Sequence, residues 1–177
     1  MTPSSAERTR SLVLLALLTS AAILLRCGES LLPLPAALGG MRPGLANAVT
    51  VICLYLLTFR QTAMLLAVRI LLTALLLAGF MTPGFFIGLS GAALSLLCMY
   101  AGYKSRWFSP YGVSVLGAAA HNMGQLAMAA FIMGTGAVAQ LLPFLLLISI
   151  PFGLLTGFAA ARLIPVLQAV RSGEIHL

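Results

Sequence analysis

The sequence predicts an all-α integral membrane protein, a single transmembrane domain over residues 1–177 with six transmembrane helices. The chain is 61% hydrophobic and only 7% charged, and its mean hydropathy is +1.09, whereas soluble domains carry about 25% charged residues. Its apolar runs are long and continuous, unlike the short alternating segments of a membrane β-barrel. At about 20 residues per span, a chain of this length accommodates roughly six helices.

The first expected span covers residues 11–26 and follows a polar tip that contains Arg8 and Arg10. A basic tip before an apolar stretch is also typical of a signal peptide, but no Ala-x-Ala cleavage site follows. We therefore expect this helix in the mature protein. Ala16 and Ser20 are four residues apart on it, and such small residues either receive a partner helix or serve packing within the chain.

A segment rich in proline and glycine, Cys27 to Pro43, precedes the second expected span at residues 44–59. It also contains many apolar residues, so we expect it to fold over the protein as an external cap that carries Glu29 and Arg42. Asn47 lies one turn inside the span. Arg42 beside the helix N-terminus either helps to bind an anion or anchors the helix end at the interface.

The third and fourth expected spans are residues 61–80 and 85–102, joined by a Thr-Pro-Gly turn. Arg69 lies roughly 12 Å into the third helix. An arginine at this depth either faces the protein interior or extends its side chain back to the interface. The fourth span carries Ser90 and Ser95, which can form hydrogen bonds to neighbouring helices or to a ligand.

The fifth expected span, residues 110–133, carries the most distinctive polar pattern, and the sixth covers residues 139–164. Ser114, His121 and Gln125 share one stripe of the fifth helix, and Asn122 lies at its edge. A polar stripe in an apolar helix must face something other than lipid. Three roles are open for the histidine, namely contact with a ligand, hydrogen bonding between helices, and proton transfer.

Basic residues predict the orientation of the chain in the membrane. One set of helix ends carries most of them, and the opposite set carries only Arg26 and Arg42, together with Glu29. The rich set is Arg8, Arg10, Arg60, Lys104, Arg106, Arg162 and Arg171. Because cytoplasmic loops are enriched in lysine and arginine, both termini are expected in the cytoplasm of a bacterial cell, and the polar residues converge on a cavity open to the outside.

Several function classes are a poor match to this composition. The net charge of +7 comes from residues between apolar runs, without a basic patch interleaved with aromatic residues, so nucleic acid is not an expected partner. All three acidic residues are glutamates, and no P-loop or nucleophile elbow is present. Cys27, Cys53 and Cys98 are far apart and predict neither a metal site nor a disulfide framework. We expect no enzyme activity, cofactor or metal.

A series of motifs resembles the Gx transporter family, whose members are often labelled heptaprenyl diphosphate synthase component I. These proteins are similar to the substrate-binding S-components of energy-coupling-factor (ECF) vitamin transporters. The resemblance covers roughly residues 12–163. The matching motifs are Glu29-x-x-x-Pro33, Arg42-Pro43-Gly44-Leu45-Ala46-Asn47, Arg69, Ser90-Gly91-x-x-x-Ser95 and Gly112-Val113-Ser114-x-x-Gly117-Ala118-x-x-His121-Asn122-x-x-Gln125. At Arg42-Pro43 the chain departs from the family, which commonly has a Lys-Leu or similar pair there.

The resemblance implies a six-helix S-component-like bundle with a substrate pocket on its outer side. It also implies that the first helix docks on a transmembrane coupling protein that carries two cytoplasmic ATPases, and Ala16 and Ser20 match this docking pattern loosely. The synthase label does not fit the chemistry of the chain. Prenyl-chain elongation needs aspartates to hold magnesium and diphosphate, and the sequence contains no aspartate.

The leading prediction is a substrate-binding subunit in the cell membrane for uptake of a small vitamin-like or prenyl- or quinone-related precursor. The expected substrate contacts are Glu29, Arg42, Asn47, Arg69, Ser90, Ser114, His121, Asn122 and Gln125. The alternative is a structural or electron-transfer-associated membrane subunit that partners a flavin or quinone protein. A third hypothesis, an intramembrane enzyme, requires turnover that depends on His121.

Overall fold

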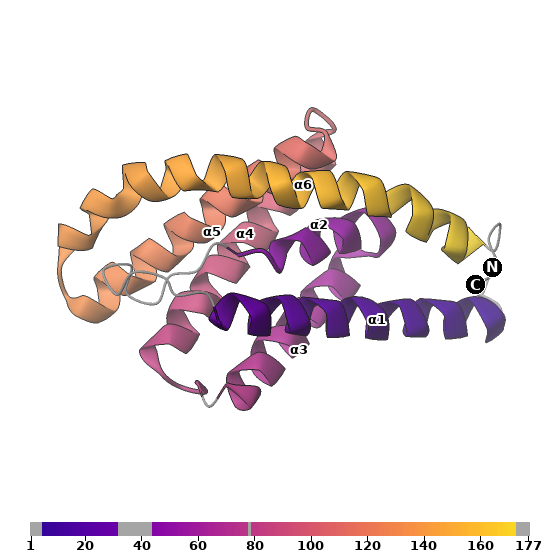
Figure 1. Cartoon of the computed structure of the whole chain (residues 1–177), viewed down its shortest axis with the longest axis horizontal. Helices are drawn as coiled ribbons and strands as arrows, with labels where there is room; N and C mark the ends of the chain where they lie inside the picture. Colours follow the sequence, from indigo (N-terminus) through magenta and orange to yellow (C-terminus); the bar gives the residue numbers. More distant parts are fainter. Residues whose placement is uncertain (1–4, 32–43, 78, 173–177) are drawn as a thin grey trace.

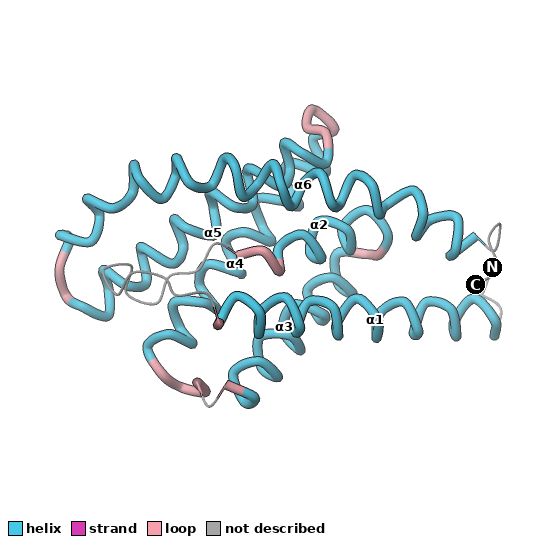
Figure 2. Tube along the Cα trace, viewed as in Figure 1, coloured by secondary structure: helices cyan, strands magenta, loops and turns pink. Residues whose placement is uncertain are grey.

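The computed structural model describes residues 5–31, 44–77 and 79–172 of the chain. These residues form helices joined by short turns, without a β-strand among them (Figure 1, Figure 2). The elements are α1 (Ser5–Ser30), α2 (Asn47–Leu56), α3 (Phe59–Leu76), α4 (Pro83–Ser105), α5 (Pro110–Met133), the 3-10 helix η2 (Gly136–Leu141) and α6 (Leu142–Ser172). The predicted all-α class is therefore confirmed.

Among the described residues, five helical segments are long and apolar enough to cross a bilayer, and α2 is too short to be a sixth. With its ten residues, α2 is about 15 Å long, against a hydrocarbon core of about 30 Å. Every residue of α2 except Tyr55 is buried. The expected second span, 44–59, is thus replaced by a shorter helix enclosed within the bundle, and the count of six spanning helices is not confirmed.

Polar contacts fix the C-terminal end of α2. Leu57 follows α2, and Thr58 then caps α3, since its hydroxyl accepts from the N–H of Gln61 at 3.3 Å and its own N–H donates to the Gln61 side chain at 3.0 Å. Arg171, in the last turn of α6, donates to the carbonyl of Leu56 at the end of α2. A carbonyl without an intrahelical partner is thereby satisfied.

Three helices are longer than the sequence predicts, namely α1, α6 and, by a few residues, α4, which covers 83–105 where 85–102 is expected. The first continues to Ser30, so Glu29 lies in its last turn and not in a loop, while most of the expected cap, including Arg42, lies outside the described residues. The last helix continues through Pro165 to Ser172, beyond the expected end at residue 164. Proline within a membrane helix is tolerated where neighbouring groups satisfy the freed carbonyl.

Consecutive helices, the short α2 included, alternate in direction, so the start of α1 and the end of α6 lie at the same end of the molecule (Figure 1). This arrangement agrees with two termini on one side, and their cytoplasmic location stays a prediction. The enclosed α2 lies between α1 and α6 in this view and is in contact with both. Buried residues of α1, α2, α3, α4, α5 and α6 join in one apolar core.

Helix α5 is packed most closely, against α4 on one side and α6 on the other. Glycines permit this approach. A Cβ atom at Gly124 would lie 2.7 Å from the carbonyl oxygen of Ser90, and one at Gly153 would lie 2.6 Å from the Cα of Val115. Such distances are possible only without a side chain, so these helices meet backbone to backbone.

Candidate functional site

A cavity of about 240 Å³ lies among the end of α1, the start of α2, the middle of α3, the start of α4 and α5. Charged and polar side chains line one part of it, and apolar side chains line the rest. The polar part comprises Arg26, Glu29, Asn47, Arg69, Thr73, Thr82 and His121, and the apolar part includes Ile70, Ala74, Leu77, Phe85 and Ala92. The cavity is thus both charged and apolar, as expected where a small amphipathic molecule binds.

The N-terminal end of α2 forms one wall of the cavity and is held from two sides. The carboxylate of Glu29 accepts from the N–H of Leu45, just before the helix. On the other side, Nη1 of Arg69 donates to the carbonyl of Ala46 at 2.8 Å. The positive end of the α2 dipole is therefore fixed inside the bundle and beside the cavity.

Arg69 is a charged residue enclosed by the protein, with 5% of its surface exposed. It lies on α3, about 15 Å along the helix from its start, and faces α2 and not lipid. Within the described part of the chain, the recorded ion pair joins Arg26 to Glu29 at 3.1 Å, and Arg69 has none. Burial of a guanidinium without a paired anion is costly, so its position calls for a reason beyond packing.

Asn47 is the first residue of α2 and is 4% exposed, yet its side-chain nitrogen Nδ2 has no hydrogen-bond partner among the described residues. This amide can lie close to α5 because Gly44, earlier in the chain, has no side chain. The Gly44 φ of +75° favours glycine, and a Cβ atom there would lie 3.0 Å from Nδ2 of Asn47 and 3.1 Å from Cδ2 of His121. An unsatisfied donor thus lies at the cavity, next to the imidazole.

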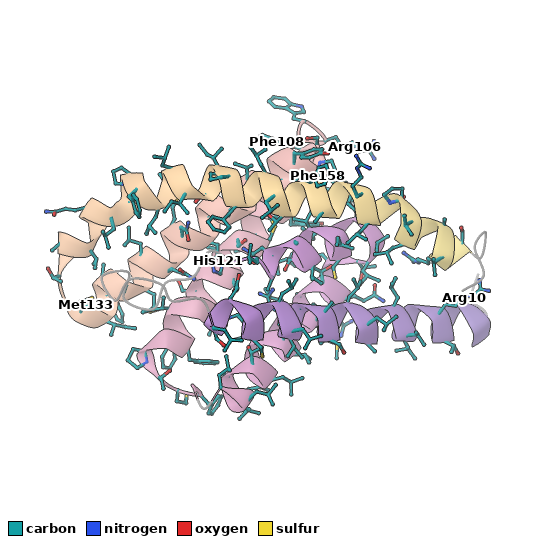
Figure 3. The ribbon with its side chains drawn as sticks, in the orientation of Figure 1. Arg10, Arg106, Phe108, His121, Met133 and Phe158 are labelled. Carbon is teal, nitrogen blue, oxygen red and sulfur yellow. The ribbon has the colours of Figure 1, made fainter. Side chains whose placement is uncertain are left out.

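His121 lies in the middle of the molecule, between the end where Arg10 lies and the end where Met133 lies (Figure 3). Its Nε2 is 2.7 Å from the amide nitrogen of Gln125, one turn further along α5. This contact between Gln125 and the imidazole holds the ring in place, and His121 lines the cavity.

Comparison with known proteins identifies the family of this chain. The family described as heptaprenyl diphosphate synthase component I matches residues 18–163, most of the chain. The protein belongs to this family. No curated protein and no solved structure gives a significant match. The resemblance read from the motifs is therefore confirmed, and the family description together with the five long apolar helices supports a multi-pass membrane protein.

The name of the heptaprenyl diphosphate synthase component I family describes a component, and hence a protein that works with others. No catalytic centre is evident in the described residues of this member. In particular, no group of three or more His, Cys, Asp or Glu side chains lies close enough to hold a metal ion there. The chemistry of the cavity is that of hydrogen bonding and charge, which suits binding.

The cavity of this family member brings together four of the nine residues expected to contact substrate, namely Glu29, Asn47, Arg69 and His121. Gln125 supports the histidine, and Arg42 lies outside the described residues. Three others bond to neighbouring helices. These contacts are Ser90 Oγ to the Gly124 carbonyl at 2.9 Å, Ser114 Oγ to Thr156 Oγ1 at 2.7 Å, and Asn122 Nδ2 to Ser149 Oγ at 2.8 Å and the Leu145 carbonyl at 3.1 Å.

Sequence reasoning missed Arg26, which lines the cavity and pairs with Glu29. The signal was present, because Arg26 is one of only two basic residues expected at the outer ends of the helices. It would have been recognised if the first helix had been extended by one turn, since residues i and i+3 then share a face. The residues expected to dock a partner, Ala16 and Ser20, lie exposed on α1, and the Ser20 hydroxyl donates to the Ala16 carbonyl at 2.9 Å.

Proposed function

We propose that this protein is a substrate-binding membrane subunit that captures a small molecule for uptake into the cell. One observation carries the proposal. The bundle contains a partly open cavity whose wall, among the described residues, includes a buried guanidinium without an ion pair at Arg69 and an unsatisfied side-chain nitrogen at Asn47, next to His121. Groups of this kind are costly in a membrane protein unless a ligand satisfies them.

The architecture of α2 supports the same proposal. In many membrane transporters, substrate sites are built where a helix is interrupted and its N-terminal end points to the ligand. Helix α2 has half the length of a span, and its N-terminal end borders the cavity. The vitamin-like or prenyl- or quinone-related class of precursor comes from the family resemblance. A cavity of about 240 Å³ corresponds to the volume of about eight water molecules, so it suits a small precursor better than a long prenyl chain.

Uptake by this subunit would require an energy source from elsewhere. The sequence has no P-loop with which to hydrolyse ATP. We propose that a transmembrane coupling protein with cytoplasmic ATPases supplies it, as in the transporters that the family resembles. The exposed face of α1 that carries Ala16, Leu17 and Ser20 is the proposed docking surface.

Native mass spectrometry of the full chain, purified gently in detergent, tests the proposal. We expect one small molecule per protein in the wild type and a marked loss of it in Arg69→Ala and His121→Ala. Ser95→Ala is the matched control, because Ser95 is buried in the same bundle but bonds to the Gly117 carbonyl on α5. Full retention of the bound molecule by both cavity variants, or its absence from the wild type, would reject the proposed function.

A further inference from the structure

The charges around the cavity do not balance. The described residues that line it include two arginines, Arg26 and Arg69, and one carboxylate, Glu29. The carboxylate pairs with Arg26 at 3.1 Å and also accepts from the Leu45 backbone. Glu29 also interacts electrostatically with Arg69, without a recorded ion pair between the two, so one carboxylate serves two arginines and these described residues carry a net charge of +1.

Two further features favour negative charge at this part of the cavity. The positive end of the α2 dipole lies at the cavity, held by the contact between Arg69 and the Ala46 carbonyl. The Nδ2 group of Asn47, buried and without a partner in the described part of the chain, lies at this end of the helix. The backbone N–H groups of Leu45, Asn47 and Ala48 already have partners, so the helix end contributes through its dipole. One free amide donor, this dipole and a guanidinium together favour an anion.

We infer that the ligand carries one anionic group, a carboxylate or a phosphate, which binds between Arg69, Asn47 and the N-terminal end of α2. The inference rests on the proposed function and names the class of its substrate. A carboxylate matches the net charge of +1 more closely than a phosphate dianion does. The uncharged part of the ligand lies against the apolar side of the cavity, formed by Ile70, Leu77 and Phe85.

Three small aromatic probes separate the anionic class from its alternatives. Benzoate, phenyl phosphate and benzamide share a ring and differ in the head group. Their binding to the full chain in detergent is measured by isothermal calorimetry at constant ionic strength. We expect benzoate to bind about ten-fold or more tightly than benzamide, because a hydrogen bond to a charged group contributes about this factor. The ratio of benzoate to phenyl phosphate distinguishes a carboxylate ligand from a phosphate ligand.

Substitutions at Arg69 and Glu29 test whether the head group of the ligand is negatively charged. Arg69→Gln should abolish the preference for benzoate over benzamide, and Arg69→Lys should keep part of it. Glu29→Gln retains an acceptor for the Leu45 N–H but removes a negative charge, so it should tighten phenyl phosphate more than benzoate. Arg162→Gln is the control for loss of a positive charge, because this arginine stacks on Phe158 at 5.1 Å and does not line the cavity.

The outcomes separate the inference from the function on which it rests. Equal binding of benzoate and benzamide, or a preference unchanged in Arg69→Gln, would overturn the anionic class while leaving a binding subunit. No binding of any probe would also overturn the anionic class. If the native mass spectrum of the wild type were empty as well, the proposed function would fall with it.

Discussion

Asn47 and Asn122 are both almost wholly buried, with 4% and 3% of their surfaces exposed, but they do opposite things. The Asn122 amide donates to the Ser149 hydroxyl and the Leu145 carbonyl, and so joins α5 to α6. The side-chain nitrogen of Asn47 has no partner among the described residues, and Asn47 lies at the cavity. The type of a buried polar residue therefore does not reveal its role, whereas the presence of a partner does.

The two asparagines represent two regions of the bundle. In the α4–α5–α6 unit, glycines bring backbones together and the hydroxyls of Ser90, Ser95 and Ser114 bond across the helix interfaces. Among α1, α2 and α3, contacts between helices are fewer than in the α4–α5–α6 unit, and charged groups border the cavity. The first region is held together by close packing and hydrogen bonds between helices, and the second has polar groups at a cavity, where we propose that a ligand binds.

The largest effect on stability is expected from a methyl group added inside the α4–α5–α6 unit. In Gly124→Ala the new Cβ atom would lie 2.7 Å from the Ser90 carbonyl oxygen and 2.9 Å from the Gly91 Cα. Backbone cannot move aside easily, so the free energy of unfolding should fall by about 1–3 kcal/mol. Unfolding in mixed detergent and SDS micelles measures it.

Gly28→Ala is the matched control at the end of α1, since no atom of the described residues lies within 4 Å of a Cβ atom there. Alanine is the better helix former, so this variant should be unchanged or more stable by up to about 1 kcal/mol. Comparable destabilisation by Gly28→Ala and Gly124→Ala would contradict the contrast between a tightly packed and a loosely packed region.

The second comparison uses the two asparagines themselves. Asn122→Ala removes two hydrogen bonds from the interface of α5 and α6, and should lower the free energy of unfolding by about 1–2 kcal/mol. Asn47→Ala removes an amide nitrogen that has no partner in the described residues, so stability should be nearly unchanged or improved. Binding of benzoate should respond in the opposite way, with loss in Asn47→Ala and retention in Asn122→Ala. If Asn47→Ala proved the more destabilising variant, the amide would have a structural role.

Much of the fold could be predicted because hydropathy and helix caps are local signals. The expected fifth span, 110–133, coincides with α5, which begins at a Ser-Pro cap and ends at Gly134 in a left-handed conformation. The length of α2 could not be predicted in the same way. Its sequence is as apolar as a span, and only its burial and the cap at Thr58 show that it is enclosed within the bundle.

The site could be predicted only in part, because the role of a polar residue depends on the partners that it contacts in the folded protein. Helix periodicity placed Ser114 and His121 on one stripe, and this is correct for the isolated helix. Different groups face α5 at different positions along it, so Ser114 contacts Thr156 of α6 while His121 lines the cavity. The side chains that a polar stripe faces depend on packing across long sequence separations, which no local pattern encodes.

The smallest expected effect concerns the hydroxyl pair of Ser114 and Thr156, whose oxygens are 2.7 Å apart between α5 and α6. A double-mutant cycle with Ser114→Ala and Thr156→Val isolates their interaction, which should be about 0.6 kcal/mol, because hydrogen bonds between membrane helices are weak on average. Thr156 also donates to the Phe152 carbonyl at 2.8 Å, so part of its bonding survives the loss of Ser114. Ligand binding should be unaffected in all three variants, since neither residue lines the cavity. A coupling energy near zero together with weaker binding of benzoate would instead link this hydroxyl pair to the ligand site. The site would then extend into the α4–α5–α6 unit.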